Sequence, residues 1–240
     1  TLAVSLVLVT VMLPLSFFVL RHRRPAALGL SPDGAELPAS ESARAVSTRP
    51  AAAHPRQALR SVALWSTAAA FACGLFVQVG FLTHHVAIAA ADLGLAGAAW
   101  LVGATGLTGL AGRLWLARVA DSVNPRLYSA GLLGVQTLTL AWLAAVPEGT
   151  VLIAASLVYG FCLGQITTLS PIVVRRELGA AHFGTLYGTA GTVIQLCSAF
   201  GPAAYGVLHA LCGGYGPVLA VAAAFELLGM VILLLGRPRT

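Results

Sequence analysis

The sequence predicts an all-α polytopic membrane protein with seven transmembrane helices. Of its 240 residues, 58% are hydrophobic and 9% are charged, whereas about 25% of the residues in a soluble domain are charged. The apolar residues are gathered in seven continuous stretches of roughly the ~20 residues that a membrane-spanning helix needs. Continuous stretches favour helices over the alternating strands of a membrane barrel. All fourteen positive charges are arginine, and they fall into four clusters between the stretches.

The seven predicted spans follow one another at short intervals, except after the first. They cover residues 2–20, 61–87, 94–115, 127–146, 150–174, 185–211 and 217–236. Small residues are dense within them: glycine recurs every third residue from Gly103 to Gly112, and GxxxG occurs at 160–164 and 184–188. Small faces let membrane helices approach closely. We therefore expect helix packing at these glycines, with gating as the alternative role.

The arginines predict the orientation of the chain. The connections after the first, third and fifth spans and the C-terminal tail hold all fourteen, while those around Asp92, at 147–149 and at 212–216 hold none. Under the positive-inside rule, the arginine-bearing sides are cytoplasmic, in a plasma or inner membrane. The net charge of +6 does not indicate nucleic-acid binding, because the arginines lie at helix ends without interleaved aromatic residues.

One long connection divides the chain. Residues 25–55 are rich in Ala, Ser, Pro and Arg and lack apolar periodicity, which is typical of a flexible linker. The predicted domains are a single helix at 1–20 that ends one bundle, a cytoplasmic linker at 21–57, a six-helix bundle at 58–236 and a tail at 237–240. Because the chain starts at Thr1 inside an apolar run, we expect it to be the latter part of a longer protein.

The most specific motif follows the third span, where residues 112–126 read GRLWLARVADSVNPR. This stretch resembles a cytoplasmic loop signature of the major facilitator superfamily, in which a glycine precedes Ala-Asp-Arg and Gly-Arg. Asp121 and Arg126 match the signature, while Ala117, Ser122 and Asn124 depart from it. Asn124 is a mild replacement for glycine, because asparagine tolerates a left-handed turn. The family carries this loop between helices two and three and a weaker copy between helices eight and nine, and the degenerate form suggests the second.

Three further stretches resemble the monocarboxylate-transporter-like or oxalate–formate-antiporter-like branch of that superfamily. They are LGLSPDG at 28–34, FVQVGF at 76–81 and RRELGAAHFGTLYG at 175–188, which are similar to the central loop, helix seven and the connection between helices ten and eleven. The resemblance implies helices six to twelve of a transporter with two six-helix halves and alternating access. It implies a small organic anion as substrate, a coupled proton or exchanged anion, and missing N-terminal helices of the same transporter as partner.

Arg113 is the leading candidate for substrate binding. An arginine at membrane depth is costly and usually faces a cavity or a partner, and its planar fork suits a carboxylate. The resemblance assigns an arginine near this point of helix eight to the substrate carboxylate, with an acid one turn earlier. Gly109 stands in place of that acid, which weakens proton coupling by this pair. The alternative is that Arg113 ends the helix and reaches the headgroups.

Two other charged or titratable groups have candidate roles. Asp121 with Arg118 and Arg126 is expected to act as a conformational latch that breaks when the halves rock, the alternative being a solvated pair of little energy. His84 and His85 are a candidate proton relay, since histidine titrates near neutrality. Ordinary interfacial histidines are the more common case.

Several uncharged polar side chains lie inside the apolar spans. Gln78, Gln165, Tyr187 and Gln195 are the candidates for lining the substrate cavity, although hydrogen bonds between helices explain such residues equally well. Glu226 lies at the middle of the last span, where a carboxyl group would be protonated or paired. We expect a structural role for it, because the twelfth helix is peripheral in the family.

Two other classes of protein compete with a transporter. A seven-helix receptor or sensor fits the predicted topology, although a retinal protein is excluded because the chain has no lysine for the Schiff base. An intramembrane enzyme has little support, since HExxH, GxSxG and a pair of intramembrane aspartates are all absent from the sequence. The four cysteines form no CxxC pair. No catalytic residue, metal site or cofactor is therefore expected.

Overall fold

A computed structural model describes residues 10–11, 14, 59–146, 149–179 and 182–236. The chain separates into two units, residues 1–52 and 53–240, and nearly all described residues belong to the second. The predicted first span lies outside the described residues except at positions 10, 11 and 14. The predicted linker at 21–57 and the tail at 237–240 also lie outside them, so the domain boundaries stay a prediction.

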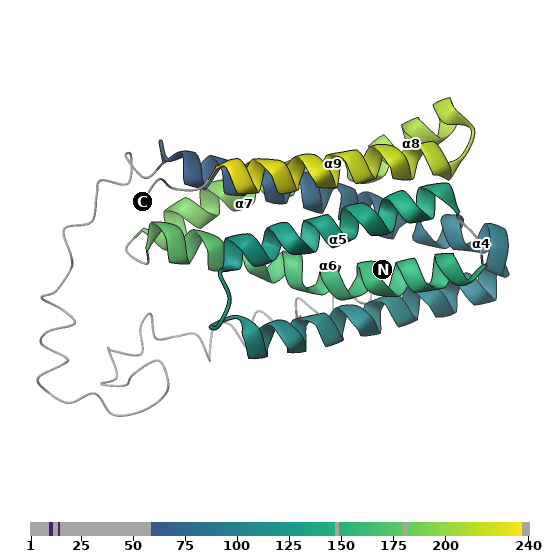
Figure 1. Cartoon of the computed structure of the whole chain (residues 1–240), viewed down its shortest axis with the longest axis horizontal. Coiled ribbons are helices and arrows are strands. Elements are labelled where there is room, and N and C mark those ends of the chain that lie inside the picture. The colour runs from purple at the N-terminus through teal and green to yellow at the C-terminus, as the bar shows by residue number, and fades with distance from the viewer. Residues whose placement is uncertain (1–9, 12–13, 15–58, 147–148, 180–181, 237–240) are drawn as a thin grey trace, which may run out of the picture. The chain divides into compact units, whose positions relative to one another are not determined.

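The second unit is a bundle of helices, and its described residues contain no strand (Figure 1). The helices are α4 (Val62–Val119), α5 (Pro125–Ala145), α6 (Gly149–Leu178), α7 (Phe183–Ala199), α8 (Gly201–Cys212) and α9 (Tyr215–Leu235). Five stretches of helix in the described residues are long and apolar enough to cross a membrane, with α7 and α8 together forming one of them. The prediction of an all-α polytopic membrane protein is thus confirmed.

Helix α4 contains two of the predicted spans. Its 58 residues would extend about 87 Å at 1.5 Å per residue, far beyond the ~30 Å of a bilayer core. Gly94 interrupts the helix with φ 66° and ψ 174°, a conformation open essentially to glycine alone. Figure 1 shows the two parts of α4 meeting at one end of the bundle and running back to the other. Helical structure therefore replaces the loop expected around Asp92, and the turn is confined to one residue.

The helix ends fall into two groups at opposite ends of the bundle (Figure 1). The first group, here called the arginine end, comprises the start and end of α4, the starts of α5 and α7 and the ends of α6 and α9. Arg60, Arg118, Arg126, Arg175 and Arg176 are the described arginines in or next to those segments. The opposite end comprises Gly94, the end of α5, the start of α6 and the α8–α9 connection. The alternation along the sequence is thus an alternation in space.

The loop at 120–124 ends in a helix cap. Asn124 has φ −74° and ψ 113°, and its side chain accepts hydrogen bonds from the backbone N–H groups of Arg126 and Leu127. Pro125 follows at the first position of α5, where a missing N–H costs nothing. The expectation of a left-handed turn at Asn124 is wrong. Asparagine is used here because its carboxamide oxygen caps a helix.

The glycines of α4 serve two different purposes. A Cβ at Gly109 would lie 3.3 Å from the carbonyl oxygen of Gly160 on α6, and a Cβ at Gly112 would collide with the Phe161 carbonyl. In contrast, a Cβ at Gly103 or Gly106 would meet no atom within 4 Å. Close packing between α4 and α6 therefore accounts for half of the repeat.

Candidate functional site

The crossing of α4 and α6 places Arg113 on the surface of the bundle. Gly112 turns toward α6, so the next residue along the helix points outward, and the Arg113 side chain is exposed. Its Nε donates a hydrogen bond to the Gly164 carbonyl oxygen on α6 at 3.2 Å. No other partner of this guanidinium group is found among the described residues. Its two terminal nitrogens thus remain available for a carboxylate.

Arg113 does not lie at the arginine end but some distance along α4 from it. Six residues separate it from Val119, where α4 ends, which corresponds to about 9 Å along the helix. Thr167 on α6 is also exposed, and its hydroxyl donates to the same Gly164 carbonyl at 3.4 Å. The two side chains therefore share one anchoring atom and form the polar part of this crossing.

Gln165 lies beside this crossing but turns into the bundle. Its Oε1 accepts a hydrogen bond from the Tyr128 hydroxyl of α5, and its Nε2 donates to the Phe161 carbonyl of its own helix at 3.2 Å. The side chain is fully buried. Its amide is therefore already bonded within the bundle, whereas Arg113 next to it is exposed.

The other predicted cavity residues are distributed over two helices, α4 and α7. Gln78 on the first part of α4 is 2% exposed, and its Nε2 has no hydrogen-bond partner in the described structure. Tyr187 on α7 is half-buried and stacks on Phe183 with ring centroids 5.5 Å apart. The Ser170 hydroxyl of α6 donates a hydrogen bond to the Tyr187 hydroxyl at 3.4 Å. Gln195 is exposed on α7. Arg113 and Gln165 are thus the pair that the fold brings to one crossing.

His84 and His85 point toward different neighbours. His84 Nε2 lies 3.1 Å from the Pro202 carbonyl oxygen, so this nitrogen is the donor, and Nδ1 lies 2.9 Å from the Tyr215 hydroxyl. His85 is fully buried, and its Nε2 lies 3.0 Å from the Ser156 hydroxyl of α6. The adjacent histidines therefore contact separate helices, and no bond joins them.

Arg126 is the centre of a buried network at the arginine end. Its Nε donates to Glu177 Oε1 of α6 at 3.1 Å, and the Arg126 side chain is 3% exposed. Its terminal nitrogens donate to the Gly236 carbonyl at 3.2 Å and to the Ser66 and Thr67 hydroxyls of α4 at 2.7 and 3.2 Å. One guanidinium group therefore joins α5 to α4, α6 and the end of α9.

Asp121 belongs to a second, exposed network. Arg176 of α6 donates to Asp121 Oδ1 at 3.1 Å and also to the carbonyl oxygens of Ala120 and Val123, at 2.8 and 3.0 Å. Arg118 bonds the Leu114 carbonyl of its own helix at 3.3 Å. The ion pairs thus join Asp121 to Arg176 and Arg126 to Glu177, rather than Asp121 to Arg118 or Arg126.

Sequence reasoning gave no role to Arg176 and Glu177. The sequence shows an Arg-Arg-Glu run at the end of an apolar span. Such a run does not indicate which residues elsewhere in the chain it will contact. Glu177 lies 51 residues from Arg126 along the chain. Two helices must pack in a particular rotation before such groups meet.

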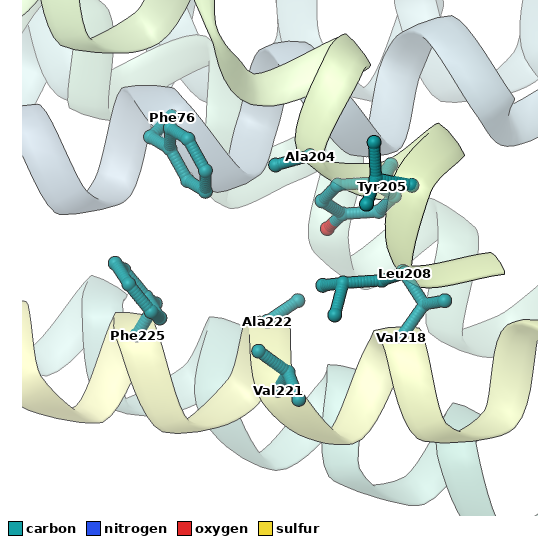
Figure 2. A pocket seen from close by; sticks show the side chains of 9 residues that line it. Phe76, Ala204, Tyr205, Leu208, Val218, Val221, Ala222 and Phe225 are labelled. Atoms are coloured by element: carbon teal, nitrogen blue, oxygen red, sulfur yellow. The ribbon is translucent and has the colours of Figure 1, made fainter. Parts of the chain in front are cut away.

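A hollow of about 340 Å³ lies between α4, α8 and α9. Figure 2 shows its walls, which are formed by apolar and aromatic side chains such as Phe76, Leu208 and Phe225. None of the predicted substrate residues lines it. A charged ligand would lose its hydration there without gaining a partner. This hollow is therefore a poor site for a small anion, and Arg113 stays the better candidate.

Comparison with protein families gives a match over most of the chain. Residues 1–202 match the family model described as Major Facilitator Superfamily. The matched region includes α4, α5, α6 and α7, and therefore the crossing at Arg113 and both ion-pair networks. A search of curated proteins found no match to this chain.

Proposed function

Because the chain belongs to the major facilitator superfamily, whose members are secondary transporters, we propose that it moves small organic anions of the monocarboxylate type across the membrane by alternating access. At the family level this function is transport and not enzymatic catalysis. The family match lends no support to the receptor alternative.

The exposed Arg113 guanidinium is the observation that carries the proposal. It lies within an apolar span, it is oriented by one hydrogen bond to the Gly164 carbonyl, and its terminal nitrogens have no hydrogen-bond partner among the described residues. A charge in that place is costly unless it meets a partner. A carboxylate can accept two parallel hydrogen bonds from these nitrogens, which makes it the best-matched small ligand.

In this proposal, the described bundle is one half of a transporter that has two halves. Further helices of the same transporter would cover the face that carries Arg113, and the substrate would bind between the halves. The arginine end would face the cytoplasm of a plasma or inner membrane. Asp121 and Arg126, with Arg118 nearby, would form contacts of the latch at that end, and His84 and His85 remain candidates for a coupled proton.

Uptake of a labelled monocarboxylate into proteoliposomes that contain the complete transporter tests the proposal. Arg113→Ala removes the fork, and we expect KM to rise by about tenfold to a hundredfold, since a hydrogen bond to a charged group contributes about 1.5–3 kcal/mol. Arg113→Lys keeps the charge without the fork, and we expect an intermediate KM. Arg175→Ala, which removes an exposed arginine at the helix end, is the matched control and should transport normally.

Two results would overturn parts of this proposal. Unchanged uptake in both Arg113 variants would remove this residue from the substrate site. A transporter that is folded and moves other solutes, but no monocarboxylate, would show that the substrate class is wrong while leaving the family intact.

A further inference from the structure

A carboxyl group lies in the interior of the bundle, and no described residue places a cation beside it. Glu226 of α9 is fully buried, and its Oε1 accepts a hydrogen bond from the Tyr159 hydroxyl of α6 at 3.4 Å. Its Oε2 has no hydrogen-bond partner among the described residues. A Cβ built on Gly74 would lie 3.6 Å from this second oxygen, so Oε2 faces α4.

Four other buried side chains in the described residues have polar atoms without partners. They are Gln78 Nε2 and His85 Nδ1 on α4, both amide atoms of Gln136 on α5 and the Tyr205 hydroxyl on α8, and each of these residues is at most 2% exposed. Buried polar atoms in proteins are nearly always hydrogen-bonded, and an unsatisfied one calls for an explanation such as internal water or a functional role. Four helices contribute such an atom, counting Glu226 on α9.

Helix register places the two glutamines near Glu226. A Cβ on Gly74 of α4 would contact both Leu133 of α5 and Glu226 of α9. These three residues therefore lie at about the same height along the bundle. Gln78 follows Gly74 by four residues and Gln136 follows Leu133 by three, and both helices run away from the arginine end there. Each glutamine is thus about one helical turn, or ~5 Å, from that level in the same direction.

Tyr205 approaches the same region from the other side. A Cβ on Gly80 would collide with the Tyr205 ring, so this ring lies directly against α4, two residues beyond Gln78. Tyr205 also shares the wall of one hollow with Ala222 and Phe225, which precede Glu226 on α9 (Figure 2). Four of these five residues therefore occupy one layer of the bundle, here called the polar layer: Gln78, Gln136, Tyr205 and Glu226. His85 lies seven residues beyond Gln78 on α4 and is not part of it.

In the part of the chain that the structure describes, the titratable groups that face Glu226 supply no positive charge. Tyr159 and Cys162 face it from α6, Cys73 from α4 and Tyr205 from α8. The buried Gln136 of α5 is neutral. His85, one to two turns further along α4, bonds Ser156 instead. An ionised carboxylate would be buried without compensation, which is expensive in an apolar interior. The group is therefore held as the neutral acid.

We propose that Glu226 is a proton-binding site inside the bundle, and that internal water held by Gln78, Gln136 and Tyr205 solvates its carboxyl group. Water needs two to four polar partners to occupy a protein interior, and the polar layer supplies five unpaired atoms. This solvation gives the proton a route to leave and return. The inference concerns the proton alone and does not depend on which substrate the transporter carries.

Labelling with dicyclohexylcarbodiimide tests the proposal on the unsubstituted protein in membranes. This apolar reagent adds to protonated carboxyl groups, so we expect mass spectrometry to find an adduct on Glu226 at neutral pH. The adduct should disappear as the pH is raised, because the site then releases its proton. Asp121, which is fully exposed, is the control in the same sample: it should instead react with a water-soluble carbodiimide.

Infrared spectroscopy gives an independent readout. The carbonyl band of a neutral carboxylic acid should be present in the unsubstituted protein and lost in Glu226→Gln. Asp92→Asn is the matched control and should keep the band, because Asp92 is exposed at the opposite end and accepts a bond from the Gly149 N–H at 2.7 Å.

Two outcomes would overturn the inference. An unmodified Glu226 at neutral pH would show that the group is ionised or sealed from the apolar reagent. An adduct that forms equally from neutral to strongly alkaline pH would show a permanently protonated group that exchanges nothing. Both outcomes come from labelling of the unsubstituted protein, so they stand even if Glu226→Gln does not fold.

Discussion

At the scale of single residues, two ion pairs at the arginine end differ sharply in burial. The Arg126 and Glu177 side chains are 3% and 15% exposed, whereas the Arg176 and Asp121 side chains are 38% and 106% exposed. Removing one partner from a buried pair leaves an uncompensated charge, while an exposed pair is replaced by water at little cost. Arg126 should therefore contribute to stability, and Arg176 chiefly to the position of a loop.

Substitution of Arg126 measures this difference. Arg126→Met leaves Glu177 unpaired in a poorly hydrated place, and we expect a loss of about 3–5 kcal/mol in unfolding free energy. Thermal unfolding of the purified protein in detergent reports the change. Arg176→Gln is the matched control and should unfold close to the temperature of the unsubstituted protein. Equal losses in the two variants would contradict the distinction between the networks.

At the scale of helices, the packing of α4 on α6 depends on glycines that a repeat alone does not distinguish. A Cβ on Gly164 would collide with the backbone of Gly109, which cannot move aside as a flexible side chain could. Gly106 belongs to the same glycine repeat of α4 as Gly109, but a Cβ on Gly106 would meet no atom within 4 Å. The same residue type therefore permits close approach at one position and leaves a gap at another.

Alanine substitutions separate these two kinds of glycine. Gly164→Ala must push α4 and α6 apart, and we expect a loss of roughly 1–3 kcal/mol, as for other overpacked sites. It should also displace the Gly164 carbonyl that anchors Arg113. Gly106→Ala is the control and should be neutral or slightly stabilising, because alanine is the better helix former. Thermal unfolding of both variants checks the prediction, and a neutral Gly164→Ala would refute the close contact.

At the scale of the whole bundle, the charges define two unlike ends. Five described arginines lie at or beside the helix termini of the arginine end, while the described residues of the opposite end, around Gly94 and at the ends of α5 and α8, include no arginine. Moving an arginine across a bilayer is costly during insertion, so this asymmetry should fix the orientation of the protein. Arg113 departs from the pattern by lying inside a span.

Cysteine labelling in cells tests the orientation. Cys212 is exposed at the opposite end, so a membrane-impermeant maleimide should label it in intact cells. Ser122→Cys, made in a Cys212→Ser background, lies at the arginine end and should be labelled only in inverted vesicles. Cys197 is exposed within a span and should resist the polar reagent from either side, because lipid surrounds it. The reverse pattern at Cys212 and position 122 would refute the cytoplasmic arginine end.

The sequence by itself determined the spans and the family. Six of its seven apolar stretches correspond to helical spans of the described bundle, and the described arginines other than Arg113 lie at one end of it. Hydropathy and loop charge are local properties of each segment. They can therefore be read from the sequence without knowing which helices pack together. Even so, the turn at Gly94 and the cap at Asn124 were not foreseen, because both depend on a single residue's backbone conformation.

Only the tertiary structure decided which polar groups meet. Nothing local to the chain pairs Arg126 with Glu177, 51 residues away, or brings the Ser66 hydroxyl to the Gly236 carbonyl, 170 residues away. The same holds for Glu226, whose neighbours Tyr159, Cys73 and Tyr205 come from three other helices. Helix rotation and register set these contacts, and small residues such as Gly74 and Gly112 fix the rotation through the close approach of two backbones.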